Sequence, residues 1–372
     1  MSVHYYFNNN TDTPTFDELL DSMPKNDTII NNLIKGYNIF SNPEYQNICC
    51  SISGGSDSDV VMDLCSKLAE VCGKKITYCF CNTGLESKWT IAHLDELEQR
   101  YHTKIERIRP DVPVPLAVRE HGQPFLSKQV SENIMRLQAH GFQYEDDTFQ
   151  NLLDKYCEKS DKPASGYAHY NGAYYRGCYS ALEWWCNEKG EKSQFNINYN
   201  KGLKEFLIKN PPTFKIANIC CFESKKKPMH DYLFHPGTNE LRFDLVVIGV
   251  RKQEGGVRKA AYHNCFSPTK SMIKKGENIQ YAEYRPLFFY SDKDKAQYVE
   301  HFGITHSKLY GPEYGLKRTG CCGCPFGQNS AEELEALERN EPQLTKAAKN
   351  IFRDSIAYEE QYQAFRKNMK EV

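Results

Sequence analysis

The sequence lacks an excess of charge of either sign and lacks any long apolar run. Lys and Arg number 47, Asp and Glu number 48, and the formal net charge is −1. This balance excludes a global positive field that would attract nucleic acid, so a polyanion would need a local basic patch. No stretch approaches the roughly 18 apolar residues that span a bilayer, and the N-terminus lacks the basic-then-apolar order of a secretory signal. We therefore expect no membrane association and a cytoplasmic location.

Cysteine, in contrast, is abundant. The 15 cysteines are spread over 372 residues of ordinary globular composition, 40% hydrophobic and 26% charged. This dilution argues against a small secreted disulfide scaffold and favours reduced thiols or metal ligands. Cys65 and Cys72 lie in an apolar helical pattern, and Cys79 and Cys81 in a strand-like one. We expect these four to be small buried hydrophobic residues.

Strand-like and helical patterns alternate in the first part of the chain. A strand at 45–52 ends at a Ser-Gly-Gly turn, and a helix follows and stops at Gly73. Strands at 75–81 and 104–108 flank a helix at 88–101. This alternation predicts an α/β fold, a doubly wound, mostly parallel, Rossmann-like sheet with ligands at the carboxyl ends of the strands.

The pattern also suggests an order of segments along the chain. We expect a helical N-terminal extension, an α/β core in two pieces, a helical and aromatic insertion that carries the first cysteine pair, and helices at the C-terminus. The strand-like run Leu241–Val250 marks where the core resumes. The respective boundaries are 1–40 for the extension, 41–110 and 241–330 for the core, 111–240 for the insertion and 331–372 for the C-terminal helices.

A glycine turn joins the first strand to the first core helix. Its glycines allow close approach of an anion, its hydroxyls add hydrogen bonds, and the helix directs its N-terminal N–H groups at the bound charge. An ordinary Gly-Ser turn capped by Asp57 is the alternative interpretation. The turn lacks the ending of a Walker loop and the spacing of a dinucleotide fingerprint. The candidate phosphate-binding residues are Ser53, Gly54, Gly55, Ser56, Asp57 and Ser58.

Three segments in order carry a resemblance to a known family. The turn at 53–58, SGGSDS, resembles the SGGxDS loop of the PP-loop ATP pyrophosphatases, the adenine nucleotide alpha hydrolase-like superfamily. The segment 81–86 is similar to the DTG-x-E motif of the phosphoadenosine phosphosulfate reductase branch, with Asn82 where Asp is usual. The segment 249–254, followed by Arg258, is similar to that branch's G-x-R-x-x-E…R pattern. The resemblance implies a PP-loop fold that binds an adenine nucleotide.

The resemblance also implies roles for single residues. The loop 53–58 would hold the phosphates of ATP, and Thr83 and Gly84 would line the adenosine pocket. Asp57, Ser58, Arg251 and Arg258 are the candidate catalytic residues, the two arginines because a guanidinium forms paired bonds to phosphoryl oxygens. Surface ion pairs are the alternative for both arginines. Two acidic residues would either order a Mg²⁺ ion through water or pair with these arginines, namely Glu86 and Glu254.

A cysteine constellation is the second strong signal. Cys220-Cys221 and the C-x-x-C pair Cys321 and Cys324 supply four thiolates, enough for an iron–sulfur cluster. Adjacent cysteines bind a single zinc ion awkwardly, whereas a cubane offers each a separate iron, which favours a 4Fe-4S cluster. The same order, with the surrounding residues 215–228 and 318–327, is similar to that of iron–sulfur adenylylsulfate reductases. Cys322 would then replace a neighbouring ligand, relay sulfur or pack, and Cys265 is a weaker candidate for a redox or fifth-ligand role.

Two departures from the reductases bear on function. Reductases of this branch usually have an altered loop, whereas this chain keeps Ser-Gly-Gly-x-Asp-Ser, and no cysteine follows Cys324 to act as a C-terminal nucleophile. Both departures favour ATP over a sulfonucleotide as the substrate. We predict an enzyme that activates an acceptor with release of pyrophosphate and uses the cluster in sulfur transfer, with DNA or tRNA as acceptor and a protein as sulfur or electron donor.

Two alternatives stay open. The first is a sulfonucleotide reductase whose nucleophile is Cys322 or Cys265 or comes from a partner. The second is a non-catalytic nucleotide and nucleic-acid binding module of a defence or modification complex, in which Lys225–Lys227, Lys201–Lys209 and the aromatic insertion contact the nucleic acid. A solvated face and an aromatic core explain the same lysines and aromatic residues without a nucleic acid.

Overall fold

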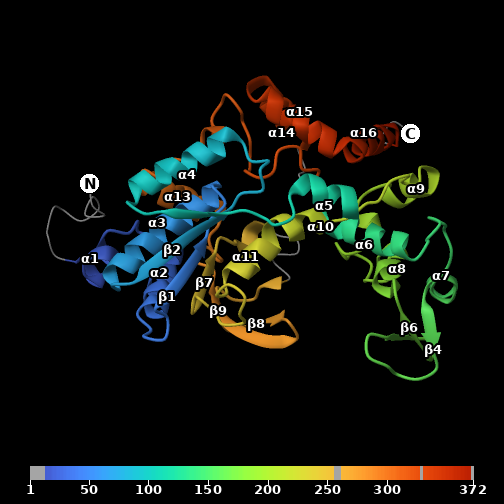
Figure 1. The fold of residues 1–372 in the computed structure, drawn as a ribbon, viewed down its shortest axis with the longest axis horizontal. Helices are drawn as coiled ribbons and strands as arrows, with labels where there is room; N and C mark the ends of the chain where they lie inside the picture. Colours follow the sequence, from blue (N-terminus) through green and yellow to red (C-terminus); the bar gives the residue numbers. More distant parts are fainter. Residues whose placement is uncertain (1–12, 255–260, 327–329, 370–372) are drawn as a thin grey trace. The chain divides into compact units, whose positions relative to one another are not determined.

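The computed structural model describes residues 13–254, 261–326 and 330–369. The chain divides into two compact units (Figure 1), which are described here one at a time. The first comprises Met1–Asp111 and Lys225–Cys321, and the second comprises Val112–Ser224 and Cys322–Val372. The first 12 residues of the expected N-terminal extension, the candidate Arg258 and Gly327 lie outside the described residues.

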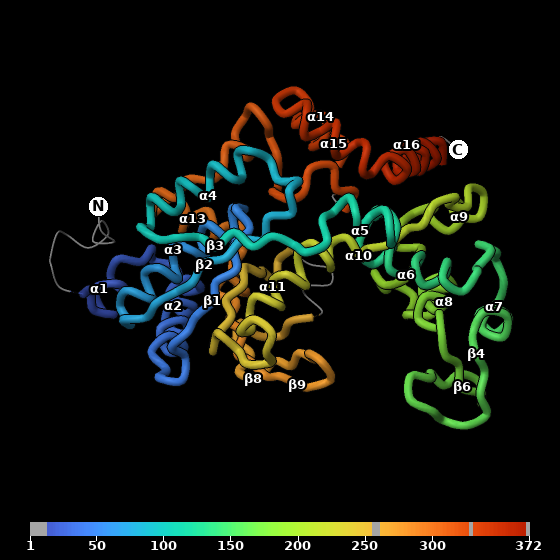
Figure 2. Tube along the Cα trace, in the orientation of Figure 1, coloured from blue at the N-terminus to red at the C-terminus, as the bar shows by residue number. Residues whose placement is uncertain are grey.

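A six-stranded sheet in the order β3-β2-β1-β7-β9-β8 forms the centre of the first unit. All neighbouring strands are parallel except β8 and β9, which form an antiparallel hairpin. β7 pairs with β1 although the two are far apart in the sequence (Figure 1), and Figure 2 traces the chain through β1, β2 and β3. The expected α/β class with a mostly parallel sheet is confirmed. The strands are β1 (Asn47–Ser51), β2 (Lys75–Cys81), β3 (Ile105–Ile108), β7 (Leu245–Ile248), β8 (Phe266–Lys274) and β9 (Glu277–Tyr284).

Helices pack on this sheet through one apolar core. Val60, Leu64 and Leu68 of α3 are fully buried with Ile48 of β1, because the apolar residues of α3 recur at helical spacing. Side-chain caps mark several helix starts, among them Ser87 before α4, which accepts a hydrogen bond from Trp89 N–H. The helices of this unit are α1 (Phe16–Asp21), α2 (Asp27–Phe40), α3 (Ser56–Val71), α4 (Lys88–Arg100), α11 (Lys227–Tyr232) and α13 (Asp292–His301).

The second unit is mainly helical and has an aromatic core. Trp184 and Trp185 are buried in it together with Phe206 and with Tyr358 and Tyr362 of the C-terminal helix. A small antiparallel sheet, in the order β4-β6-β5, belongs to the same unit and was not predicted. Its strands are β4 (Glu158–Ser160), β5 (Ala168–Tyr170) and β6 (Ala173–Arg176). Its helices are α5 (Val114–His121), α6 (Lys128–Ala139), α7 (Phe149–Tyr156), α8 (Tyr179–Trp185), α9 (Leu203–Lys209), α10 (Ile219–Cys221), α14 (Ser330–Asn340), α15 (Pro342–Ile351) and α16 (Arg353–Asn368).

Among the described residues, no helix has both the length and the apolar character needed to cross a membrane.

A buried ion pair lies on α3, beyond the first turn of the helix. Lys67 and Asp63 are both almost completely buried and pair with each other. Tyr101 and Tyr298 donate hydrogen bonds to the Asp63 carboxylate at 3.0 and 2.9 Å. The Lys67 ammonium also lies 3.6 Å from the ring centroid of Phe302. The pair thus ties α3 to α4 and α13.

We predict that Lys67→Met destabilises the protein strongly, because the Asp63 carboxylate then stays buried without its cation. The expected loss is about 3–5 kcal/mol of unfolding free energy, measured by denaturant titration. Arg136→Met, which breaks an exposed ion pair with Glu132, should cost no more than about 0.5 kcal/mol. The double variant Asp63→Asn with Lys67→Met should lose less than the single variant. A loss below about 1 kcal/mol for Lys67→Met alone would contradict the argument.

Candidate nucleotide-binding site

The glycine turn connects the carboxyl end of β1 to the first residue of α3, a helix of 16 residues. Gly54 has a φ of +66°, a conformation that favours glycine, and a Cβ there would lie 3.0 Å from Thr90 Cγ2. Gly55 is the residue before α3, and a Cβ there would lie 2.9 Å from Thr319 Oγ1. Both glycines are therefore required by the local packing, and the turn has the strand–glycine–helix form of an anion-binding loop.

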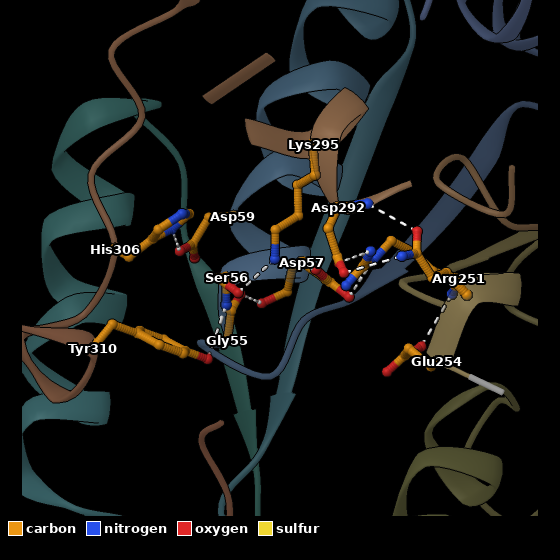
Figure 3. Close-up of polar contacts among 12 residues, drawn as sticks. Gly55, Ser56, Asp57, Asp59, Arg251, Glu254, Asp292, Lys295, His306 and Tyr310 are labelled. Carbon is orange, nitrogen blue, oxygen red and sulfur yellow. Dashed lines mark hydrogen bonds and ion pairs between the residues drawn. The ribbon is translucent and has the colours of Figure 1, made fainter. Parts of the chain in front are cut away.

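Two residues that the sequence analysis did not single out contact the first residue of α3. Tyr310, in the short 3₁₀ turn Lys308–Tyr310, accepts a hydrogen bond from Ser56 N–H at 3.1 Å. Lys295 of α13 donates to Ser56 Oγ at 2.8 Å and to Asp57 Oδ1 at 2.6 Å. Figure 3 shows both side chains converging on the start of α3. The helix N-terminus thus has an ammonium and a phenol within hydrogen-bond distance.

Arg251 reaches the same place from the segment after β7. Its Nε donates to Asp57 Oδ2 at 2.8 Å and its Nη1 to Asp292 Oδ1 at 2.7 Å (Figure 3). Burial alone would raise the pKa of Asp57, but the hydrogen bonds and charges of Arg251 and Lys295 outweigh it and lower the pKa. Asp57 is therefore ionised and holds the two cations beside the loop.

Ser58 and Asp59 complete the first turn of α3 and are buried. Ser58 Oγ donates to Gly55 O at 2.7 Å, so it stabilises the turn itself. Asp59 lies between two imidazoles, with Oδ1 2.9 Å from His93 Nε2 and Oδ2 2.7 Å from His306 Nδ1. His306 packs its ring against Tyr310. Asp59 thereby connects α4 and the segment that carries Tyr310 to the start of α3.

The second motif forms a tight turn after β2. The carboxylate of Glu86 accepts hydrogen bonds from Thr83 N–H at 2.9 Å, Thr83 Oγ1 at 2.8 Å and Gly84 N–H at 3.1 Å. Gly84 has a φ of +83°, as this turn requires. Lys225 Nζ is 3.8 Å from the same carboxylate. The carboxylate of Glu254 similarly accepts the backbone N–H of Arg251 at 3.1 Å.

A pocket of about 150 Å³ lies between the glycine turn at 53–58 and the turn that contains Glu86. It is at the carboxyl ends of β1 and β2, where a parallel sheet places its ligands. Thr83 and Gly84, expected there, are beside it rather than among its lining residues. The lining includes Ser53, Phe80, Cys81, Glu86, Met229 and Thr319.

The candidate cluster ligands are divided between the two units. All 15 cysteines lie in the described part of the chain and are present as thiols. Cys321 ends the first unit, and its Sγ is 3.3 Å from Thr83 Oγ1. Cys220, Cys221 and Cys324 belong to the second unit. Among the described residues, no group of three or more His, Cys, Asp or Glu side chains is arranged to hold a metal ion.

The remaining cysteines differ in burial. Cys65 and Cys79 are fully buried, as expected, whereas Cys72 and Cys81 are only partly buried. Cys322 is 2% exposed and Cys265 is 7% exposed, so both are packed in the protein interior.

Sequence reasoning missed the residues that reach the loop from distant segments. Ser53–Ser58 and Arg251 are brought together as expected, but Lys295, Tyr310, His306 and Asp292 join them from positions without a local motif. Only the Ser291 capping box at the start of α13 gives a sequence signal nearby, and it indicates a helix start rather than a site.

The His93–Asp59 pair makes stability depend on pH. Burial lowers the pKa of His93, but hydrogen bonds and charges of Asp59 and Glu96 outweigh it, so the pKa is raised above the ordinary 6.5. A raised pKa in the folded state means that the pair stabilises fully below the unfolded value and is lost as pH rises through the folded value. We predict that the stability difference between the native protein and His93→Gln shrinks with rising pH.

Denaturant midpoints measured from pH 5.5 to 8.5, in steps of about half a unit across the range in which a histidine titrates, test this prediction. His301→Gln provides the matched control, because His301 is exposed and its Nε2 lies 2.8 Å from the carbonyl oxygen of Ser22, so the variant makes the same change without removing a buried ion pair. A His93→Gln difference that stays constant or grows with pH would contradict the assignment.

Comparison with known proteins agrees with this geometry. Residues 47–153 match the family model described as the phosphoadenosine phosphosulfate reductase domain. The solved structure of phosphoadenylyl-sulfate (PAPS) reductase from Candida auris, a phosphate complex, is 12% identical, covering 82% of this chain and 93% of that chain. Its TM-score is 0.36, so this likeness carries no argument about function. No curated protein matches the chain in sequence.

The matched range contains the glycine turn and the segment 81–86, two of the three motifs that carry the resemblance. The resemblance to the phosphoadenosine phosphosulfate reductase family that the motifs indicate is therefore confirmed over residues 47–153.

Proposed function

We propose that this protein is a PP-loop enzyme that binds ATP, activates an acceptor with release of pyrophosphate, and serves sulfur transfer. One observation carries the proposal: Arg251 and Lys295 converge on the first turn of α3, at the glycine turn after β1. Backbone N–H groups at a helix N-terminus, together with a guanidinium and an ammonium, are the groups that bind phosphates in proteins.

The loop sequence supports ATP rather than a sulfonucleotide. The loop keeps Ser-Gly-Gly-x-Asp-Ser, the form that the resemblance associates with the terminal phosphates of ATP, whereas a sulfonucleotide has no pyrophosphate to place there. A Cβ at Gly54 or Gly55 would lie 3.0 Å from Thr90 Cγ2 or 2.9 Å from Thr319 Oγ1, so the backbone of the loop packs closely against its neighbours.

The proposed reaction is an in-line substitution at the α-phosphorus of ATP. An acceptor oxygen attacks, the bond between the α-phosphorus and the bridging oxygen breaks, and pyrophosphate leaves with its electron pair. Lys295 and Arg251 stabilise the negative charge on the departing phosphates, because both are fixed beside the loop. Tyr310, whose hydroxyl lies at the Ser56 N–H, orients the same phosphates.

The cluster is the second part of the proposal. The donor set fits a 4Fe-4S cluster, because Cys220, Cys221, Cys321 and Cys324 are all thiols and all four-iron clusters of this kind bind thiolates. Gly323 has a φ of +67°, so the C-x-x-C segment turns at its glycine. A bound cluster would supply electron transfer, and it would offer an open iron to a sulfur atom only if one of the four thiolates did not bind. The acceptor of the activated group would be a DNA or tRNA base, and a partner protein would donate sulfur or electrons.

A second candidate function rests on one specific contact. Cys321 Sγ is 3.3 Å from Thr83 Oγ1, in the turn that borders the pocket. A thiol at this position favours the alternative of a sulfonucleotide reductase, since a thiolate is the nucleophile that attacks sulfur in that reaction. The family match to the reductase domain supports the same alternative.

Pyrophosphate release from ATP, measured with and without tRNA and DNA, tests the first proposal. We predict that Lys295→Met lowers kcat/KM about 10- to 100-fold, because it removes one charge-assisted hydrogen bond to the phosphates. Lys293→Met is the matched control on the same helix, since Lys293 is exposed, and it should leave the rate within about twofold.

Sulfite formation from adenylylsulfate, without pyrophosphate release from ATP, would overturn the first proposal in favour of the reductase. Salt-dependent binding of DNA or tRNA without turnover of either nucleotide would overturn both and favour the binding module.

Iron and sulfide analysis of protein purified without oxygen tests the cluster. We predict about four irons and about four sulfides per chain, with a brown colour. Cys221→Ser and Cys324→Ser should each reduce the iron content sharply, whereas Cys186→Ser, outside the candidate ligand set, should not. Colourless protein that contains zinc alone would contradict the prediction.

A further inference from the structure

Two thiols of the second unit lie within reach of each other, away from the nucleotide-binding residues. The sulfur atoms of Cys157 and Cys178 are 3.9 Å apart. Cys157 is partly exposed and directly follows α7, whereas Cys178 is buried and directly precedes α8. Side-chain rotation can bring these atoms to the disulfide bond length of about 2.05 Å.

Regular structure on both sides fixes the backbone of this pair. Cys157 N–H donates to Leu153 O at 2.9 Å and so ends α7. The carbonyl of Cys178 accepts from Ala181 and Leu182 at the start of α8. Between the two cysteines, β4 pairs with β6, and its terminal pair is Glu158 with Arg176. Cys157 and Cys178 therefore lie next to the end of the β4–β6 strand pair, and this pairing keeps their backbones close together while the unit is folded.

The two thiols differ in how readily they ionise. The hydrogen bond with Cys157 and the charge of His140 lower the pKa of Cys178 to about 7, against the effect of burial. The His140 ring is packed against Gly177, where a Cβ would lie 2.8 Å from Nε2. The hydrogen bond with Cys178 and burial raise the pKa of Cys157. When protonated, Cys178 donates a hydrogen bond to Tyr156 O at 3.7 Å. Cys178 is therefore the more readily ionised of the two thiols.

Two other arrangements of thiols in the chain show that distance alone does not decide reactivity. Cys49 and Cys79 have sulfur atoms only 3.3 Å apart, but both are completely buried in the sheet, and the hydrogen bond and burial raise the pKa of Cys79. Cys186 lies in the same unit as Cys157, and burial raises its pKa to about 11. Of these five cysteines, only Cys157 and Cys178 have sulfur atoms near each other, one residue that is partly exposed and one thiol with a lowered pKa.

We propose that Cys157 and Cys178 form a reversible disulfide and are a redox modification site of the second unit. The partly exposed Cys157 first passes its proton to Cys178, and the Cys157 thiolate attacks a low-molecular-weight disulfide, forms a mixed disulfide and releases one thiolate. Cys178 then loses that proton to solvent, and its thiolate attacks the Cys157 sulfur and releases the second thiolate. Two protein thiols are oxidised and one disulfide is reduced to two thiols, so the electrons balance.

The disulfide would fasten the small sheet to the helices on either side of it. It closes the segment 158–177, which contains β4, β5 and β6. A cross-link of this kind restricts the unfolded chain, so the oxidised protein should resist denaturant better than the reduced protein. Neither a nucleotide nor a cluster is needed for this chemistry.

Hydroxyethyl disulfide added to the full-length protein under native conditions is the probe. After alkylation of the remaining thiols and proteolysis, mass spectrometry should find a peptide that joins Cys157 to Cys178, and dithiothreitol should remove the link. The denaturant midpoint of the second unit should rise on oxidation and return on reduction. In Cys178→Ser the mercaptoethanol adduct should persist on Cys157, because no second thiol resolves it.

Controls separate this site from general thiol oxidation. Cys186→Ser should form the same link at an unchanged rate, and Cys49 and Cys79 should stay unlinked while the protein is folded. A native protein that accumulates the adduct on Cys157 without a link, or in which neither thiol reacts, would overturn the proposal. A link between Cys49 and Cys79 that forms as fast would also overturn it, because burial would then give no protection.

Discussion

The parallel pairing of β1 with β2 on one side and β7 on the other is the constraint on which the candidate site depends. Parallel strands end at the same edge of a sheet, so the turns after these three strands meet there. The register places Ser51 beside both Cys79 and Ile248, and the next residues of each strand lead into the glycine turn, the Glu86 turn and the Arg251 segment. Any change that slipped this register would separate Arg251 from Asp57.

Charge balance at the start of α3 follows from this geometry. Arg251 and Lys295 each pair with Asp57, and Asp292 takes a second bond from Arg251. An acidic residue in the first helical turn already interacts favourably with the helix dipole, so Asp57 occupies the end of α3 that favours anions. Under the proposed function, a phosphate bound there would share these cations with Asp57, which holds Arg251 and Lys295 beside the loop. The carboxylate would then be a positioning residue for Lys295 and Arg251.

The core strands and the glycine turn could be predicted from the sequence because they depend on local signals. β1, β2, β3 and β7 are short apolar runs, and Gly54 and Gly55 mark the turn where the first of them ends. The β8–β9 hairpin was not predicted from the sequence, because β8 has no continuous apolar pattern. Lys270 and Lys274 lie within β8, and Lys275 follows it. Lys295, Tyr310 and His306 escaped for another reason. Their partners lie more than two hundred residues earlier in the chain, and only the tertiary fold brings them together.

The cysteines show most clearly where sequence spacing stops being informative. Spacing picks out Cys321 and Cys324 as a ligand pair, but Cys157 and Cys178 are separated by 20 other residues and follow no motif. What makes the second pair chemically distinct is its surroundings, which are a hydrogen bond between the two sulfurs, a nearby imidazole and partial exposure of one of the two cysteines. Burial removes the same chemistry from Cys49 and Cys79 although their sulfurs are closer. Thiol reactivity in this chain is therefore determined by access and by the stabilisation of the thiolate, and neither quantity is encoded in the interval between two cysteines.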